Sequence, residues 1–420
     1  MKISVITPLP STHEKFISEA HSSLVGQTHG DWEWVIVENN GWHVPDEIRA
    51  DGRVRVVAGN GDGNNIGRLK KLAAQNSLGD IILEFDADDI LTPDCLAEVA
   101  GAIRDGVVMA YSNSAEFNSD TWASTHYSSF WGWEWRDFDY NGHRLCEMVG
   151  WEPSPHMMRY VFWAPNHVRA WDRRAYFDIG GHDERIKIGD DHDLCCRFYI
   201  KYGASGIRHI DKCLYLYRIH GDNSCRVWNV DVQNQTEANY CKYSRDMATK
   251  WAADNGLMCL DLGGRFDKWP GYSSVDKHPP ADFICDLEKR WPMPDCSVGV
   301  LRASHIVEHL ADPVFTMNEA YRVLAPGGWM FIDVPSTDGR GAFQDPTHKS
   351  FWNINSFWYY TDREFAKYIQ PEYKGRFQLS RAVTYYPNDF FRGNEISVVQ
   401  ADLIALKSPY DKRPPGGARI

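Results

Sequence analysis

The sequence predicts an α/β protein of two domains, each built around a mostly parallel sheet. Strand and helix patterns alternate over the first third of the chain, and the alternation begins again near residue 258. A length of 420 residues suits two or three domains, and the hydrophobic (43%) and charged (24%) fractions are ordinary for a soluble globular protein. In such sheets, ligands bind at the carboxyl ends of the strands.

The first domain is expected to alternate regularly at its start. Short apolar runs closed by polar residues or proline predict strands at residues 2–10, 31–40, 53–60 and 80–89. Apolar residues at helical spacing predict helices at residues 13–27 and 64–77. From about residue 110 to 225 the pattern loosens into aromatic loops, with further strands at "HVRAWD" and "CLYLYRI".

A polar helix is predicted to connect this domain to the second one. Alternation then resumes, with strands at 258–264, 272–277, 282–287, 296–304 and 327–335 and a helix at 312–325. The tail is rich in Pro and Gly and is expected to be frayed. The predicted organisation is therefore a first domain at 1–228, a connecting helix at 229–256, a second domain at 257–410 and a flexible tail at 411–420.

Composition excludes several classes of protein. A net charge of −12 argues against a general nucleic-acid binder, although a local basic cleft remains compatible with it. The ten cysteines lack CxxC spacing, which indicates reduced thiols. The first residues do not resemble a secretory signal, and no apolar run is long enough to span a membrane. We expect a cytoplasmic protein, or one peripheral to a membrane.

The stretch "ILEFDADDILTPD" (81–93) ends an apolar strand in three carboxylates, Asp86, Asp88 and Asp89. Carboxylates two residues apart at a strand end can share a divalent cation, and hard oxygen ligands suit Mg²⁺ or Mn²⁺. An isolated DxD is more often a helix cap or a solvated turn. The apolar strand before it and the helix start after it favour a metal site here.

A second acidic cluster lies in "GGHDERIKIGDDHDLCCRF" (180–198), where Asp190, Asp191 and Asp193 open a helix. One carboxylate is enough to cap a helix, so three suggest a further role. Downstream, His220 ends a strand and is a possible metal ligand. The aromatic run at 130–140 suggests a platform for a flat or sugar-like ligand, with ordinary packing as the alternative.

With these motifs in this order, residues 1–225 resemble the family 2 glycosyltransferases of the GT-A fold. The resemblance implies that Asp86 and Asp88 form the DxD motif and that Asp88 is the more direct ligand of Mn²⁺ or Mg²⁺. It implies that His220 completes the metal shell. Asp191 matches the family's general base, which would deprotonate an acceptor hydroxyl during inverting transfer.

The same resemblance implies where a nucleotide-sugar donor would bind. Its contacts would be Pro8, Glu38, Asn39, Asn65, Arg68, Asp86 and Ala87. The family often has an acidic pair after the second strand, and here the pair is Glu38–Asn39. Because Asn can both donate and accept hydrogen bonds, the donor nucleotide stays open.

Residues 257–365 resemble the class I S-adenosylmethionine-dependent methyltransferases, on "ASHIVEHL" and "RVLAPGG". The cofactor would contact Asp261, Gly263 and Gly264 on the methionine side, Asp276 at the ribose, and Asp286 and Leu287 at the adenine. Arg265 stands where the family usually has glycine, and it could crowd the cofactor.

Three histidines accompany this second resemblance. His305 and His309 follow the predicted fourth strand, and His348 lies in "DPTHKSFW". Each is either a structural histidine or a residue that deprotonates or orients an acceptor hydroxyl. His305 is the preferred catalytic residue, because the end of the fourth strand faces the transferred methyl group in this fold.

The preferred interpretation is a bifunctional enzyme of polysaccharide biosynthesis. It would transfer a sugar from a nucleotide-sugar to a glycan acceptor, and an O-methyltransferase activity would then methylate a sugar hydroxyl. Three alternatives stay open. The second domain could be a non-catalytic scaffold, both domains could form a glycan-binding module, or the first could glycosylate modified DNA bases.

Overall fold

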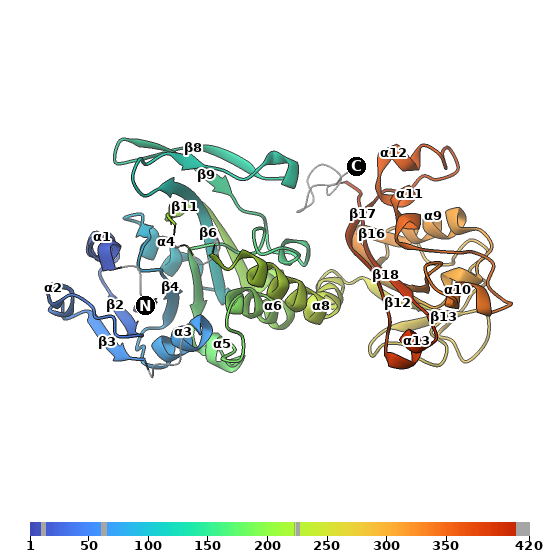
Figure 1. The fold of residues 1–420 in the computed structure, drawn as a ribbon, viewed down its shortest axis with the longest axis horizontal. Helices are drawn as coiled ribbons and strands as arrows, with labels where there is room; N and C mark the ends of the chain where they lie inside the picture. Colours follow the sequence, from blue (N-terminus) through green and yellow to red (C-terminus); the bar gives the residue numbers. More distant parts are fainter. Residues whose placement is uncertain (10–13, 60–64, 222, 224–226, 409–420) are drawn as a thin grey trace. The chain divides into compact units, whose positions relative to one another are not determined.

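The computed structural model describes residues 1–9, 14–59, 65–221, 223 and 227–408. The chain divides into two compact units, residues 1–247 and 248–420. Each unit contains its own sheet (Figure 1) and is described separately. The long helix α8 (Asn229–Asp254) begins in the first unit and ends in the second. The expected tail at 411–420 lies outside the described residues.

The first unit is built on an eleven-stranded sheet whose main path runs β3-β2-β1-β4-β10-β6-β11-β5. Its strands are β1 (Ile3–Leu9), β2 (Trp32–Glu38), β3 (Val54–Ala58), β4 (Ile81–Glu84), β5 (Ile90–Leu91), β6 (Met109–Asn118), β7 (Ser124–Thr125), β8 (Glu134–Tyr140), β9 (His143–Val149), β10 (Arg169–Asp172) and β11 (Ile207–Ile219). Strands β1 to β4 pair in parallel. The strand order reverses between β1 and β4, and such a switch point leaves a crevice at the carboxyl ends.

The helices of this unit are α1 (Glu14–Val25), α2 (Asp46–Arg49), α3 (Ile66–Gln75), α4 (Cys95–Ala102), α5 (Arg173–Asp178) and α6 (Asp190–Tyr202). The predictions for α1 and α3 are confirmed within a few residues. The predicted strand at 80–89 ends earlier, at Glu84, because the chain turns there and the Asp89 amide donates to the Asp86 carbonyl at 3.3 Å.

The expectation of loops after residue 110 is wrong, since β6 to β9 occupy much of that segment. β8 and β9 form an antiparallel hairpin (Figure 1) around Asn141 and Gly142, both at positive φ. Asn-Gly between two strands is a strong hairpin signal that the sequence analysis overlooked. The aromatic run at its start is partly core. Trp133 is buried against Trp151 and Trp163, whereas Phe130 is exposed.

The second unit has a seven-stranded sheet in the order β14-β13-β12-β15-β16-β18-β17. Its strands are β12 (Met258–Leu262), β13 (Ser273–Asp276), β14 (Phe283–Ile284), β15 (Val298–Ser304), β16 (Leu324–Pro335), β17 (Phe377–Tyr385) and β18 (Val398–Ala405). The first five are parallel, and β18 runs antiparallel to both β16 and β17. The order reverses between β12 and β15, which creates a second switch point.

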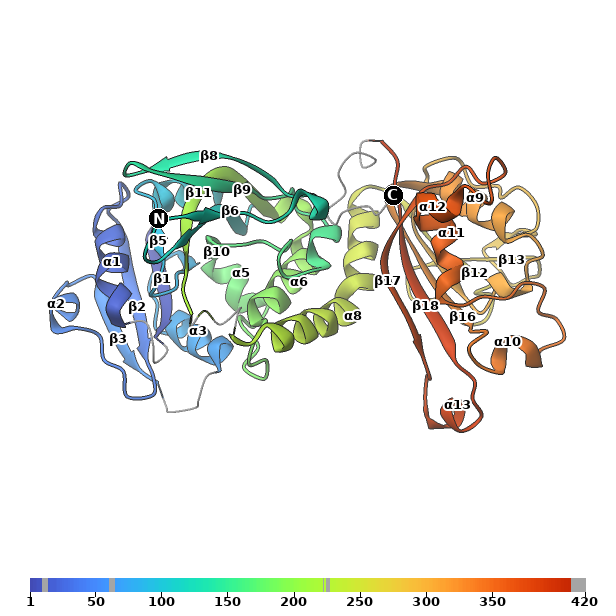
Figure 2. The ribbon, with the colours of Figure 1, turned by 45° about the horizontal axis from the view of Figure 1, so that its top comes forward.

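The helices of the second unit are α9 (Pro313–Val323), α10 (Gly341–Gln344), α11 (Trp358–Thr361), α12 (Arg363–Ala366) and α13 (Asp389–Gly393). The predicted strand at 282–287 shrinks to the two residues of β14. Strands β17 and β18, two long strands that α13 joins at one end (Figure 2), were not predicted. In the part of the chain that the structure describes, no helix is long and apolar enough to cross a membrane.

Two glycines of the first unit offer a matched test of packing. A Cβ atom at Gly79 would lie 2.7 Å from the Lys2 carbonyl oxygen and from the Ser4 amide, whereas at Gly101 in α4 it would meet open space. We expect Gly79→Ala to lower the free energy of unfolding by about 1–3 kcal/mol, because the backbone at Lys2 and Ser4 would have to move. Gly101→Ala should raise it by about 0.5–1 kcal/mol. Thermal or urea unfolding of both variants checks this, and equal effects would contradict it.

Candidate active sites

The first site is organised around Glu84, a fully buried carboxylate at the end of β4. Antiparallel pairing sets Arg169 of β10 directly opposite it. Arg169 donates to Glu84 through Nε at 3.1 Å, and Lys70 of α3 donates through Nζ at 3.2 Å. His182 Nε2 lies 2.6 Å from the other carboxylate oxygen. Burial alone would raise the pKa of Glu84, but the charges of Lys70 and Arg169 hold it well below its usual value.

Arg169 also reaches the predicted base. Its Nη2 lies 2.7 Å from Asp191 Oδ2 in the first turn of α6. Asp191 Oδ1 accepts from the His192 amide at 2.7 Å. Burial opposes ionisation, yet the charges of Arg169 and Lys70 lower the pKa of Asp191, so this carboxylate is ionised at neutral pH. Its side chain is 21% exposed and can therefore meet a ligand.

His167 lies between this pair and the predicted metal site. Its Nε2 is 3.4 Å from Arg169 Nη2 and 3.7 Å from Asp86 Oδ2. Burial and the Arg169 charge lower the pKa of His167 to about 3, so the ring is neutral. Burial and the neighbouring carboxylates raise the pKa of Asp86 to about 6. His167 and Arg169 were not predicted, because "HVRAWD" reads as a plain strand and only the tertiary pairing of β10 with β4 reveals their role.

Asp88 and His220 meet directly. His220 Nε2 lies 2.8 Å from Asp88 Oδ2, and both side chains are buried. Asp86 does not join them in a compact three-ligand group among the described residues. Asp89 has partners within the protein, since it accepts from the Tyr215 hydroxyl and the Arg218 amide, each at 2.7 Å. Asp89 is therefore engaged within the protein, and Asp86 and Asp88 remain the candidates for a ligand.

The residues proposed for the nucleotide vary in how much of the side chain is available. Pro8 and Ala87 are buried next to the switch point between β1 and β4. Glu38 accepts from the Val44 amide at 2.6 Å and pairs with Arg49.

The remaining nucleotide residues follow β2 or begin α3. Asn39 is buried directly after β2. Asn65 caps α3, accepting from the Arg68 amide at 3.0 Å and donating to the Glu184 carbonyl at 2.7 Å. Arg68 is half-buried in the first turn of that helix. The amide group of Asn65 is thus already engaged in holding the helix start.

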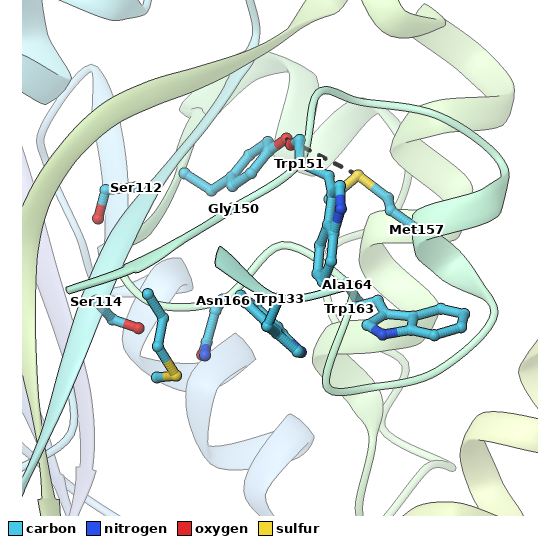
Figure 3. Close-up of a pocket in the computed structure, with 11 residues that line it drawn as sticks. Ser112, Ser114, Trp133, Gly150, Trp151, Met157, Trp163, Ala164 and Asn166 are labelled. Carbon is cyan, nitrogen blue, oxygen red and sulfur yellow. Dashed lines mark hydrogen bonds between the residues drawn. The ribbon is translucent and has the colours of Figure 1, made fainter. Parts of the chain in front are cut away.

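A pocket lined by aromatic residues lies beside the first site (Figure 3). Its lining residues are Tyr111, Ser112, Ser114, Trp133, Met148, Gly150, Trp151, Met157, Trp163, Ala164 and Asn166. Asn166 connects it to the charged network, because its Oδ1 accepts from the His167 amide at 2.8 Å. The indole nitrogens of Trp133 and Trp163 are buried and have no hydrogen-bond partner among the described residues.

In the second unit, the switch point between β12 and β15 holds the predicted glycine turn. Asp261 of β12 pairs with Arg302 of β15, with Nη1 2.7 Å from Oδ2, and also accepts from the Trp269 amide at 3.0 Å. Burial raises the pKa of Asp261 against the opposing charge of Arg302. Gly263 has φ +74°, and a Cβ at Gly264 would lie 2.6 Å from the Asp261 carboxyl carbon. Both positions need glycine, because Gly263 lies in the left-handed region and a side chain at Gly264 would clash with Asp261.

The other predicted cofactor contacts stand at the next strand ends. Asp276 ends β13, is half-buried, and accepts from the His278 amide at 2.8 Å. Asp286 follows β14 and pairs with Lys289 at 3.0 Å. Leu287 packs in the hydrophobic core, so only its main chain could contact an adenine. The guanidinium of Arg265 lies over the exposed Phe266 ring at 4.2 Å. The glycine turn and the carboxylates at the strand ends together fit S-adenosylmethionine.

His305 directly follows β15 and is exposed. Its Nδ1 lies 3.7 Å from Glu308 Oε1, and this nearby carboxylate raises the pKa of His305. The structure therefore brings His305 to the switch point. His309 and His348 lie nearby with their ring centroids 5.0 Å apart.

Comparisons with known proteins agree with this division. The model of the glycosyl transferase family 2 matches residues 4–162, and that of the methyltransferase domain matches residues 241–332. The O-antigen biosynthesis protein RfbC of Myxococcus xanthus is 27% identical over 219 residues, which are 51% of this chain and 15% of that protein. The chain thus spans only a small part of this relative's length.

Among solved structures, S. aureus TarS 1-349 is 17% identical, with 60% of this chain and 68% of that chain covered and a TM-score of 0.42. The same fragment in complex with UDP-GlcNAc is 16% identical, with 61% and 72% covered and a TM-score of 0.45. These scores are too low to support an argument about ligands. The two family matches confirm the predicted resemblances and the predicted fold class. One part of the chain thus matches the glycosyl transferase family 2 model, and another part matches the methyltransferase domain model.

Proposed function

We propose that the chain is a bifunctional glycan-modifying enzyme. Its first domain, which we place at residues 1–228, would transfer a sugar from a nucleotide-sugar to an acceptor hydroxyl with inversion. Its second, at 257–410, would methylate a sugar hydroxyl. The observation that supports this most strongly is the meeting of Asp191, Arg169, His167 and Asp86 at the end of β4, with Asp88 and His220 beside them. The similarity to an O-antigen biosynthesis protein supports a glycan as the acceptor.

In the first reaction, Asp191 is the proposed base. Arg169 keeps this carboxylate ionised and fixes its orientation, and its exposed edge can accept the proton of an acceptor hydroxyl. The residues Asp88 and His220 fit a divalent cation, Mn²⁺ or Mg²⁺, because a buried carboxylate and an imidazole already face each other. When bound, the cation would offset the charge of the leaving diphosphate. Neutral His167 separates the base from Asp86.

The aromatic pocket is the proposed binding site for the acceptor glycan. Indole rings bind the apolar faces of sugars, and the indole N–H groups of Trp133 and Trp163 can donate to hydroxyls. Asn166 links this pocket to His167 and so to the reacting centre. We therefore place the acceptor next to Asn166, outside the residues proposed for the nucleotide-sugar.

In the second domain, the proposed base is His305. Its Nδ1 faces Glu308, which favours the protonated ring after proton uptake from a hydroxyl. S-adenosylmethionine would supply the methyl group, with Asp276 at the ribose and the turn at Gly263 and Gly264 beside the methionine moiety. The nine described cysteines are free thiols, as expected in the cytoplasm, where we propose that the enzyme acts.

Donor screening tests the first activity. The full chain would be incubated with a panel of nucleotide-sugars and Mn²⁺, and release of free nucleotide would be measured together with the melting temperature. Binding to the native state raises the melting temperature by mass action. A metal-dependent shift for one nucleotide class supports the proposal and names the donor class. If no donor shifts the transition or is consumed, the glycosyltransferase activity is refuted.

Asp191→Asn should abolish sugar transfer while leaving donor affinity nearly unchanged. The amide cannot take the proton, so kcat is expected to fall by about 10²–10⁴-fold. Asp178→Asn is the matched control, because Asp178 is an exposed carboxylate of the same unit that pairs with Lys201. Steady-state kinetics and donor titration check both variants. A near-native rate for Asp191→Asn would rule this residue out as the base.

Asp88→Asn should raise the Mn²⁺ concentration needed for half-maximal sugar transfer by roughly tenfold or more, because one anionic ligand is lost. Chelator should stop sugar transfer by the native chain, and added Mn²⁺ should restore it. Asp94→Asn changes a carboxylate on the same segment that pairs with Lys212 at the surface, and its metal dependence should be native. Activity that resists the chelator would show that the transfer needs no metal.

S-adenosylmethionine should bind the full chain in the micromolar range by calorimetry. Asp276→Ala is expected to weaken this binding by about tenfold or more, because it removes the carboxylate that would accept hydrogen bonds from the ribose. Asp389→Ala, at an exposed position of α13, is the control. Absence of heat with the native chain would favour the scaffold interpretation, and Arg265→Gly would then show whether Arg265 blocks the site.

A further inference from the structure

A cluster of ligating side chains lies directly after β15, next to the proposed base of the methyltransferase unit. Atoms of Glu308, His309 and His348 that could bind a metal all lie within 4.8 Å of one another. Glu308 and His309 belong to the short 3₁₀ helix η4 (Val307–His309), and His348 comes from the segment after α10. The glycine turn and the predicted cofactor residues do not account for this cluster.

The carboxylate of Glu308 is buried, with 3% of its side chain exposed. Its Oε2 has no hydrogen-bond partner among the described residues. Its Oε1 faces His309 Nε2 at 4.0 Å, which is too far for a hydrogen bond but suits two ligands of one ion. A buried, unsatisfied carboxylate oxygen is costly unless a cation balances it.

Both imidazoles are held in the tautomer that leaves Nε2 free to bind a metal. His348 Nδ1 donates to the Ala342 carbonyl at 2.8 Å. His309 Nδ1 lies 3.1 Å from the Thr347 hydroxyl, whose own proton is donated to Asp345 at 2.7 Å. The hydroxyl can therefore only accept from His309, so Nδ1 carries the proton. Metal-bound histidines are commonly oriented through the second nitrogen in this way.

The backbone fixes the two segments together before any ion binds. The Glu308 carbonyl accepts from the amides of Lys349 and Ser350, at 2.7 and 3.0 Å. The Ser350 hydroxyl donates to the Val307 carbonyl at 2.9 Å. His348 is thereby held against η4, and the three ligands need little rearrangement to converge.

We propose that Glu308, His309 and His348 form a binding site for a divalent transition-metal ion such as Zn²⁺. Two imidazoles and one carboxylate suit Zn²⁺, Co²⁺ or Fe²⁺ better than Mg²⁺ or Ca²⁺, which prefer oxygen ligands. Three protein ligands leave a coordination position for water or for an oxygen of the substrate. His309 is 32% exposed, so that position is reachable from solvent. A role of the bound metal in methyl transfer rests on the proposed function, whereas the metal binding itself does not.

The test is metal titration of the full chain carrying Asp88→Asn, which weakens the other proposed metal site. Zn²⁺ affinity is measured by competition with a chromogenic chelator, and Co²⁺ binding by visible absorption. We expect one bound equivalent, with affinity lowered by roughly 100-fold or more in Glu308→Gln, His309→Gln or His348→Gln. His278→Gln removes an exposed histidine of the same unit and should have no effect.

Thr347 provides a variant that should not disturb folding, because its side chain lies at the surface. Thr347→Val removes the acceptor that orients His309 and should weaken Zn²⁺ binding by about tenfold, and Thr347→Ser should restore it. Absence of Co²⁺ absorption in the Asp88→Asn chain would overturn the proposal. So would native affinity in both His309→Gln and His348→Gln. Neither readout involves S-adenosylmethionine, so a failure of methyl transfer would leave the proposal of a metal site intact.

Discussion

The buried charge of Glu84 is the constraint on which the first unit depends. No water reaches this carboxylate, so its charge must be balanced by Lys70, Arg169 and His182. These residues come from α3, from β10 and from the turn before α6. Removing one partner would leave an uncompensated charge in the interior, which typically costs about 3–5 kcal/mol. The requirement therefore holds three distant segments against the end of β4.

Function is built on this balance of charge. Arg169 is shared between Glu84 and Asp191, so the residue that stabilises the interior also positions the proposed base. Nearby acids of the same type then differ in behaviour. Asp191 lies beside a guanidinium and stays ionised, Asp86 lies among carboxylates and has a raised pKa, and Asp89 is engaged by Tyr215. Different environments give chemically similar side chains different tasks.

The second unit also pairs a buried carboxylate with an arginine. Asp261 and Arg302 pair across β12 and β15 at the switch point, and the Trp269 amide completes the carboxylate. The turn after β12 relies on glycine rather than charge, because a side chain at Gly264 would strike Asp261. The first unit thus gathers several charged side chains at its switch point, whereas the second has one ion pair beside a glycine turn. This arrangement does not explain the buried Glu308 Oε2, which has no hydrogen-bond partner among the described residues.

Local patterns were enough to predict the strands and helices of both switch points. Apolar runs closed by polar residues marked β1, β2 and β12, because buried parallel strands need continuous apolar sequence. Strands β6 to β9 were not predicted, because they mix polar and aromatic residues and only the Asn141–Gly142 turn marked the hairpin. Strands β17 and β18 were also not predicted, although they pair with each other as neighbours in sequence; only the pairing of β18 with β16 is remote.

The sequence by itself determined which residues could do chemistry: Asp86, Asp88, Asp191 and His220 in one unit, and the glycine turn with His305 in the other. Only the tertiary structure decided what surrounds them. Arg169 and His167 lie about 80 residues from β4 along the chain and reach it through antiparallel pairing. His348 meets His309 only because two backbone hydrogen bonds hold their segments together. Residue type sets chemical capacity, whereas burial and the nearest charges set protonation, and those depend on contacts between distant parts of the chain.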